Sequence, residues 1–218
     1  MKAIVLTGCP HAVLIDVSHD VPHFDISAGA FMLFAGTRHF PGGTVHLGVV
    51  DPDVGSSRRR LALKAGGRYY VGPDNGLFGI VFDEVGLEQV VELAARPEAA
   101  PTFEGRDVFA PAAAALASGV PLDSLGHRTD PPRMLDNSSP RILWIDGFGN
   151  IVTNLKPPVR PMRIHSHYIT AAAKTYWDAR PNEPFVYVGS MGYLEIAVRE
   201  QRADRMLGAR SGMQIELI

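Results

Sequence analysis

Two acidic residues and three consecutive arginines share one short segment, VVDPDVGSSRRR at residues 49–60. An apolar run precedes Asp51, and a buried strand that ends in charged groups is where α/β proteins place ligand chemistry. A surface turn is the alternative, in which an aspartate bonds to its own backbone and the arginines are solvated. From this segment alone, a ligand site and a surface turn are equally good interpretations.

A second charged segment, TFEGRDVFAPAA at residues 102–113, directly precedes a predicted helix. Aspartate is favoured at the first position of a helix, so we expect Asp107 to cap it. Glu104 and Arg106 are then free to face a ligand near the positive end of the helix. GPDNGLF at residues 72–78 has the composition of a tight turn, and a turn without a ligand is the stronger interpretation there.

Two glycine-containing loops are predicted near the carboxyl end of the chain. IDGFGNIVTN at residues 145–154 contains a carboxylate, an aromatic ring and two amides, which suit a purine or ribose site. A plain hairpin loop is the alternative, and without further context it is preferred. GSMGYLEIAV at residues 189–198 adds Ser190 and Glu195 on a second loop.

Charge and motifs narrow the function class. The net charge of −2 argues against a nucleic-acid-binding protein, which should carry a basic surplus. The single cysteine, Cys9, excludes an intramolecular disulfide, and the histidines lack metal-binding spacing, so no metal is expected. The sequence has no phosphate-binding glycine loop, dinucleotide fingerprint or serine elbow. Attack by a bound water on a positioned substrate is therefore a better interpretation than catalysis by a nucleophilic side chain.

Composition is that of a globular protein, with 46% hydrophobic and 20% charged residues. No apolar run is long enough to span a membrane, and the apolar part of the amino terminus is too short for a secretory signal. The cytoplasm is therefore the expected location, and no membrane partner is expected.

Apolar periodicity predicts the elements that position these groups. Before residue 130, strands are expected at 12–17, 44–50, 61–64 and 68–71, and helices at 25–40, capped by Asp25, and at 107–118, closed by Gly119. This alternation predicts an α/β domain with a mostly parallel sheet at 1–130. After a linker at 131–140, short strands at 141–145, 185–188, 193–198 and 213–217 predict a small antiparallel β-barrel or sandwich domain at 141–218.

The sequence resembles the S-adenosylmethionine hydroxide adenosyltransferases on six segments in order: HDVPHFDISAGA, FPGGTVHLGVVDPDVGSSRR, VGPDNGL, TFEGRDVFAPAAA, DGFGNIVTN and GSMGYLEIAV. These enzymes hydrolyse S-adenosylmethionine to adenosine and are related to fluorinating and chlorinating enzymes. The resemblance runs from Met1 to Ile218. It implies an α/β domain joined to a small β-barrel, in a homotrimer whose sites lie between the amino-terminal domain of one subunit and the carboxy-terminal domain of the next. It implies no cofactor, because S-adenosylmethionine is the substrate.

The chemistry that this resemblance implies is an in-line displacement, in which water attacks the ribose C5′ and methionine departs as a neutral thioether. An Asp–Arg–His set surrounds the water in that family. Asp51 and Arg58 match its first two members, and Arg58 argues against a halogenating enzyme, because the halogenating relatives lack an arginine there. The implied substrate-binding residues are Phe24, Asp51, Phe103, Asp146, Phe148, Asn150, Ser190, Glu195 and the backbone of Val198.

Three features depart from the family pattern. Glu104 stands where the histidine is usual, and a glutamate is a weaker base by about 2 pKa units. Asp53 stands where glycine is usual, and either pairs with one of the three arginines or points to solvent. The family's first strand, with an LTDFG-like motif whose aspartate holds the ribose hydroxyls, has no counterpart. Met1 to Ala3 match the helix that follows it, although the apolar run at 3–7 alone predicts a strand.

The leading hypothesis is an S-adenosylmethionine hydrolase with Asp51, Arg58 and Glu104 as its catalytic residues. The alternative is a catalytically weak or inactive homologue that binds S-adenosylmethionine or adenosine. It is motivated by the missing ribose-binding aspartate and by Glu104, because the help of a general base is worth about 10²–10⁴ in rate. Two interpretations of the amino terminus stay open: the chain lacks the family's first strand, or Met1 is an internal methionine of a longer product.

Overall fold

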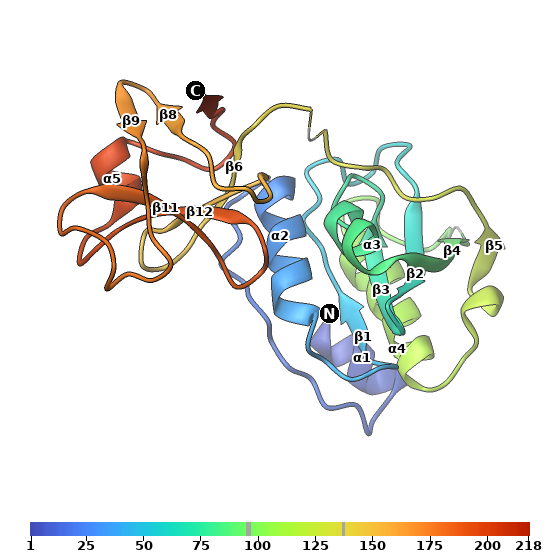
Figure 1. Ribbon diagram of the computed structural model, residues 1–218. Helices are drawn as coiled ribbons and strands as arrows, with labels where there is room; N and C mark the ends of the chain where they lie inside the picture. Colours follow the sequence, from blue (N-terminus) through green and yellow to red (C-terminus); the bar gives the residue numbers. More distant parts are fainter. Residues whose placement is uncertain (95–96, 137) are drawn as a thin grey trace. The chain divides into compact units, whose positions relative to one another are not determined.

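The computed structural model describes residues 1–94, 97–136 and 138–218 (Figure 1). The chain divides into two compact units, Met1–Leu135 and Asp136–Ile218. Each unit encloses its own hydrophobic core. Among the described residues, none of the helices has the length and apolar character needed to cross a bilayer.

The first unit is built on a five-stranded sheet in the order β1-β3-β2-β4-β5. The strands are β1 Val45–Leu47, β2 Arg60–Ala65, β3 Arg68–Pro73, β4 Leu87–Leu93 and β5 Gly126–Arg128. β1 and β3 pair in parallel and the three other pairings are antiparallel, so the prediction of a mostly parallel sheet is wrong. The reason lies between β2 and β3, where Gly66 and Gly67 both adopt positive φ. Two such residues make a tight hairpin, whereas parallel strands need a crossover of about a dozen residues.

Helices lie on both sides of this sheet: Figure 1 shows α3 (Gly79–Val85) in front of the strands and α4 (Ala110–Ala117) behind them. A π-helical turn, η1 (Gly105–Phe109), leads into α4, and both pack on the apolar side chains of β2, β3 and β4. α1 (Lys2–Gly8) packs on α4 through Val5 and Ala114. A short 3-10 helix, η2 (Leu122–Ser124), precedes β5. Residues 3–7 are therefore helical, as the resemblance implied and the apolar run alone did not.

α2 (Ile26–Thr37) confirms the predicted helix and its cap. The carboxylate of Asp25 accepts the backbone N–H of Ala28 at 2.9 Å, which satisfies one of the free donors at the helix start. The aromatic side chains of Phe31 and Phe34 are buried, as an apolar helix face requires. The strands predicted at 44–50, 61–64 and 68–71 are confirmed as β1, β2 and β3.

The predicted buried strand at residues 12–17 is wrong. This segment has no regular structure, and Val13 and Ile15 are 86% and 63% exposed. Val17 packs against α2, where a Cβ added to Gly36 would come within 2.3 Å of it. An apolar run becomes a buried strand only when another strand pairs with its backbone, and none of the described strands pairs with this one.

The second unit contains two open sheets, in the orders β10-β11-β12-β7-β6 and β13-β8-β9. Their strands are β6 Ile142–Ile145, β7 Ile151–Thr153, β8 Met162–Ile164, β9 His167–Ile169, β10 Ala171–Ala172, β11 Pro184–Val188, β12 Leu194–Val198 and β13 Glu216–Leu217. The expected β structure at 141–145, 185–188 and 193–198 is confirmed, and that at 213–217 is reduced to β13. Neither sheet closes on itself, so the predicted barrel is not confirmed.

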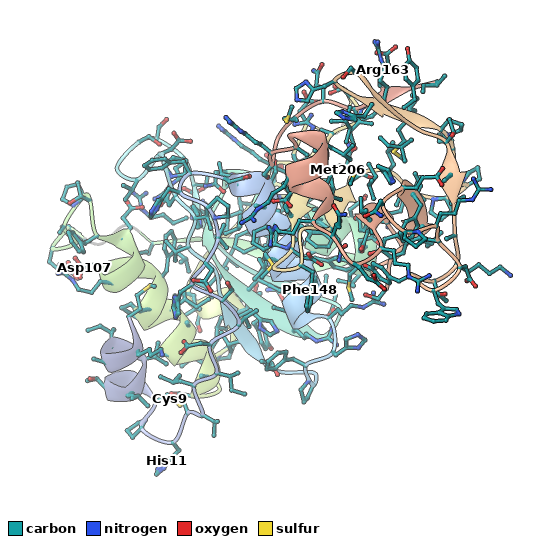
Figure 2. All side chains as sticks on the ribbon, turned by 90° about the vertical axis from the view of Figure 1, so that its left-hand side faces the viewer. Cys9, His11, Asp107, Phe148, Arg163 and Met206 are labelled. Carbon is teal, nitrogen blue, oxygen red and sulfur yellow. The ribbon has the colours of Figure 1, made fainter. Side chains whose placement is uncertain are left out.

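The core of this unit is apolar and aliphatic. Ile142, Ile151, Leu194 and Ile196 fill it from the larger sheet, and Leu207 contributes from α5 (Ala203–Leu207). Figure 2 shows Met206 on α5. Since the strands of the larger sheet are firmly packed, the loops between them are held at defined positions.

Candidate active site

The first unit brings Asp51, Arg58 and Glu104 together from three separate segments. Asp51 follows β1, Arg58 precedes β2, and Glu104 precedes η1. The Nε of Arg58 donates to Oδ1 of Asp51 at 2.7 Å, and Nη2 donates to Oδ2 of Asp51 and Oε2 of Glu104. The side chains of Arg58, Asp51 and Glu104 are 2%, 5% and 4% exposed. One guanidinium therefore bridges two buried carboxylates.

The second oxygen of Glu104 is also occupied by an arginine. Arg60, at the start of β2, donates to Oε1 through Nε at 2.7 Å, and its Nη2 forms an ion pair with the same oxygen. Glu104 is therefore not an unpaired carboxylate, because a guanidinium pairs with each of its oxygens, and its place at a ligand site stays a prediction. Sequence reasoning left Arg60 as a supporting residue of the charged turn, and the run of three arginines was its only signal.

Burial and charge act in opposite directions on this cluster. Burial raises the pKa of Asp51, and this effect exceeds that of the Arg58 bonds, which favour the ionised carboxylate. Burial opposes the charge of Arg58, but Asp51 and Glu104 raise the pKa of the guanidinium above its usual value. Asp51 is therefore a carboxylate with an increased affinity for a proton, next to a fixed positive charge.

One amino group of Arg58 is left over. Its Nη1 is buried and has no hydrogen-bond partner among the residues that the structure describes. A buried donor without a partner costs about 1–3 kcal/mol, so such groups in native proteins usually meet a water or a ligand. Nη1 is thus a donor available to a water molecule or a substrate oxygen on the side of the guanidinium that faces away from Asp51.

Arg59 serves the fold. Its Nε donates to Oδ2 of Asp74 at 2.8 Å, and its Nη1 donates to the hydroxyl of Thr129 at 2.9 Å. Asp74 also accepts the backbone N–H of Arg133 at 2.6 Å. The turn at 72–78 therefore anchors the chain near residues 129–133, in agreement with its interpretation as a structural turn. Asp53 is exposed, and the three arginines pair with other carboxylates.

Asp107 does not cap the helix as predicted. It lies inside η1 (Figure 2), and its carboxylate accepts the N–H of Ala100 at 2.9 Å and the Nε of Arg106 at 2.6 Å. Arg106 lies over the ring of Phe103, 4.9 Å from its centroid. Because the helical turn begins at Gly105, Asp107 is too far inside it to act as a cap.

Two aromatic residues that the resemblance assigns to substrate binding are exposed. Phe103 directly precedes Glu104, and its ring carries the Arg106 guanidinium on one face. Phe24 adopts a positive φ of 66°, which is rare for a bulky residue and strains the backbone. Strain of this kind is common where a side chain must be held for a ligand.

In the second unit, Asp146 organises the loop between β6 and β7. Its Oδ1 accepts the N–H of Phe148 at 2.9 Å and that of Asn150 at 2.8 Å, and its Oδ2 accepts the side-chain amide of Asn150 at 2.8 Å. Gly149 must be glycine here, since its φ is +87° and a Cβ would come within 2.5 Å of Asp204. Phe148 (Figure 2) is 81% exposed on this loop. The loop presents an aromatic ring on a hydrogen-bonded support.

Glu195 is a buried carboxylate on β12. Tyr187, its cross-strand partner on β11, donates its hydroxyl to Oε2, and the hydroxyls of Tyr176 and Tyr187 are 2.8 Å apart. Burial raises the pKa of Glu195, and the bond from Tyr187 opposes this increase. Sequence reasoning missed both tyrosines. Pairing the residues of the predicted hairpin one by one on either side of its turn would have placed Tyr187 opposite Glu195.

The other predicted residues of this unit lie close to Glu195 in the chain. Ser190 is exposed on the turn between β11 and β12, and Val198 is buried at the end of β12, opposite Pro184. As for metals, the His, Cys, Asp and Glu side chains of the described ranges form no group of three that could hold an ion.

Comparison of the sequence with models of protein families identifies the family of this chain. Residues 1–126 match the model of the SAM hydroxide adenosyltransferase N-terminal domain, and residues 140–216 match that of the C-terminal domain. The chain is a member of the SAM hydroxide adenosyltransferase family. Its fold is therefore the mixed α/β, two-domain architecture of SAM hydroxide adenosyltransferases, with several sheets and few helices.

Individual relatives agree with this membership. A protein of Thermus thermophilus named (R)-S-adenosyl-L-methionine hydrolase is 36% identical over 238 residues, which cover 100% of this chain and 92% of the relative. One of the same name from Methanocaldococcus jannaschii is 31% identical over 95% of this chain and 83% of its own length. A fluorinase of an Actinoplanes species is 25% identical over 90% and 84%. The crystal structure of an uncharacterized conserved protein from Thermotoga maritima superposes with a TM-score of 0.89 and 32% identity, covering 100% of this chain and 93% of that one.

Proposed function

We propose that this member of the family hydrolyses S-adenosyl-L-methionine to adenosine and L-methionine. The observation that carries the proposal is the buried bridge of Arg58 between Asp51 and Glu104. Within the described part of the chain, Nη1 of Arg58 has no partner and is a further donor for a ligand. Relatives that carry the name of this hydrolase match the chain almost from end to end. The charged cluster thus supplies the chemistry that a water nucleophile requires.

The reaction needs a positioned water more than it needs a strong base. The oxygen of water bonds to C5′ of the ribose, the C5′–S bond breaks, and its electron pair stays on sulfur as the neutral thioether of methionine. Asp51 takes a proton from the water, and the two-point pairing with Arg58 holds the Asp51 carboxylate in place. The raised pKa of Asp51 favours that transfer. Holding water and substrate in line supplies most of the rate, since the sulfonium is already a good leaving group.

The second unit provides the recognition of the nucleoside in this proposal. The ring of Phe148 stacks on adenine, and the loop organised by Asp146 and Asn150 supplies directional hydrogen bonds. Ser190, Glu195 and the backbone of Val198 complete this side. On the first unit, the exposed rings of Phe24 and Phe103 and the carboxylate of Asp51 also face the substrate.

The resemblance implies an assembly in which these two sets of residues serve one site. We propose a homotrimer, with each site formed between the amino-terminal domain of one subunit and the carboxy-terminal domain of the next. Sedimentation velocity tests this, and a monomer that remains fully active would contradict it. The small antiparallel barrel, the cytoplasmic location and the lack of a cofactor are further parts of the proposal.

The experiment is incubation of the purified protein with S-adenosylmethionine, followed by chromatography and mass spectrometry. Adenosine and methionine in equal amounts, without added metal or cofactor, are the expected products. Calorimetric binding of S-adenosylmethionine with no adenosine after long incubation would favour the inactive homologue. A halogenated deoxyadenosine that forms only with added halide would instead indicate a halogenating enzyme.

A further inference from the structure

We infer that Arg60 is a positioning residue for this site, which holds Glu104 as a fixed negative charge and leaves Asp51 as the group that takes the proton from water. The inference rests on the proposed function and deepens it. Without Arg60, Glu104 would be an extra carboxylate competing with Asp51 for Arg58.

The contacts of Glu104 show how Arg60 holds it. Arg58 donates to Oε2 of Glu104, and Arg60 donates to Oε1 through Nε and forms an ion pair with it through Nη2. Each oxygen of Glu104 is therefore fixed by a different guanidinium.

Asp51 differs from Glu104 in the number of its cations. Among the described residues, Arg58 is the one cation that both of its oxygens contact, and burial raises its pKa above the usual value. With one cation instead of two and a raised pKa, Asp51 is the carboxylate that takes the proton.

The charges of the cluster balance only when Arg60 is counted. Asp51 and Glu104 carry two negative charges, and Arg58 and Arg60 carry two positive ones. If Arg60 were neutral, two buried carboxylates would share one guanidinium, and the cluster would carry an uncompensated negative charge. The Arg60 side chain is 27% exposed, so its replacement disturbs the core less than that of Arg58 would.

The first test compares pH profiles of adenosine formation in Arg60→Met and the wild type. We expect kcat to fall about tenfold with little change in KM, and the acid limb of kcat to move about one pH unit higher, because a carboxyl of the cluster loses a cation. Arg60→Lys should restore part of the loss. The matched control is Lys64→Met, which removes a cation from the same strand that pairs with Glu88 instead. An unchanged acid limb in Arg60→Met, or an equal loss in Lys64→Met, would overturn the inference.

The second test asks whether Arg60 acts through Glu104. If it does, Arg60→Met should change kcat by less than about twofold once Glu104→Gln is present, because the charge that Arg60 holds is gone. Equal losses in both backgrounds would mean that Arg60 acts on its own or only stabilises the fold.

A third measurement does not depend on turnover. The ¹³C-carboxyl NMR signal of Glu104, assigned by its absence in Glu104→Gln, reports the surroundings of that carboxylate at one fixed pH. We expect its chemical shift to change in Arg60→Met and to stay the same in Lys64→Met, and an unchanged shift in Arg60→Met would reject the role of Arg60. If the wild type forms no adenosine, the proposed function fails, and this comparison still decides the inference.

Discussion

The two units hold the carboxylates of their candidate sites in different ways. In the first unit, Asp51 and Glu104 are neutralised by Arg58 and Arg60, residues of full positive charge. In the second unit, Asp146 accepts from backbone and amide N–H groups, and Glu195 accepts from the hydroxyl of Tyr187. One cluster is ionic, and the other is hydrogen-bonded by neutral donors.

This difference separates two tasks. Ion pairs in a buried site create a strong local field and keep charges fixed while a nucleophile and a leaving group exchange charge. Neutral donors impose direction and shape, which is what the recognition of a nucleoside requires. We therefore expect substitutions in the ionic cluster to lower kcat, and substitutions in the neutral cluster to raise KM.

The largest effect is expected from Arg58→Ala, which breaks the ionic cluster at its centre. Adenosine formation should fall by at least about 10³-fold, since two buried carboxylates lose their common cation and Asp51 loses the group that holds it. Arg58→Lys keeps the charge but not the planar fork, and should still lose activity because one ammonium cannot bridge as the guanidinium does. Rates are compared after circular dichroism has shown that each variant is folded. Turnover at the wild-type rate in Arg58→Ala would remove this residue from the mechanism.

A buried titratable group without an ionic partner offers a contrast within the first unit. His46 lies on β1 between the rings of Phe40 and Tyr70, with centroids 5.3 Å and 5.0 Å away, and burial lowers its pKa to about 4. Below its usual pKa of about 6.5 the unfolded chain binds a proton that the folded one does not. Stability should therefore be lost as pH falls from about 6.5 towards 4, by up to about 3 kcal/mol.

The measurement is urea unfolding of the wild type and His46→Leu between those pH values. The stability of the variant relative to the wild type should rise as pH falls. A difference that does not vary with pH would show that His46 is protonated in the folded protein as easily as in the unfolded one.

In the neutral cluster, Asp146→Ala removes the acceptor that organises the loop carrying Phe148. We expect KM for S-adenosylmethionine to rise by about 10–100-fold with kcat changed by less than about threefold, because several hydrogen bonds to one carboxylate are lost. Glu216→Ala is the control, since its carboxylate is 58% exposed and pairs with Arg163 (Figure 2) in the same unit. A loss confined to kcat would make Asp146 part of the reaction chemistry and erase the contrast between the clusters.

The smallest effect is expected from Tyr187→Phe, which removes one neutral donor from Glu195. The hydroxyl of Tyr187 lowers the pKa of Glu195, so its loss should raise that pKa further above the usual value. KM should increase about three- to tenfold, and more at acid pH than at neutral pH, because less of Glu195 stays ionised. A KM ratio that is independent of pH would mean that Glu195 does not act as a charged group.

Local sequence patterns predicted the elements that depend on local interactions. Asp25 marked the start of α2, and the apolar runs marked β1, β2, β3 and the strands of the second unit, because caps and periodicity act over a few residues. The strand predicted at 12–17 is wrong because a strand also needs a second strand to pair with its backbone. The prediction of a mostly parallel sheet is wrong because the hairpin at Gly66 and Gly67 was not recognised in the sequence.

The candidate site shows the same division. Asp51 and Arg58 were both predicted to lie on one charged turn, and they pair directly. The bond between Arg60 and Glu104 joins residues 44 positions apart, and no local pattern reports it. Asp107 was assigned as a cap because a π-helical turn cannot be distinguished from a helix start by composition alone.

The central claim is that the ionic cluster directs water to C5′ of the ribose. The most direct test is incubation with S-adenosylmethionine in water enriched in ¹⁸O, followed by mass spectrometry of the adenosine. We predict one heavy oxygen per adenosine, located in its ribose part and absent from methionine. Unlabelled adenosine, or cleavage to adenine instead, would contradict the account.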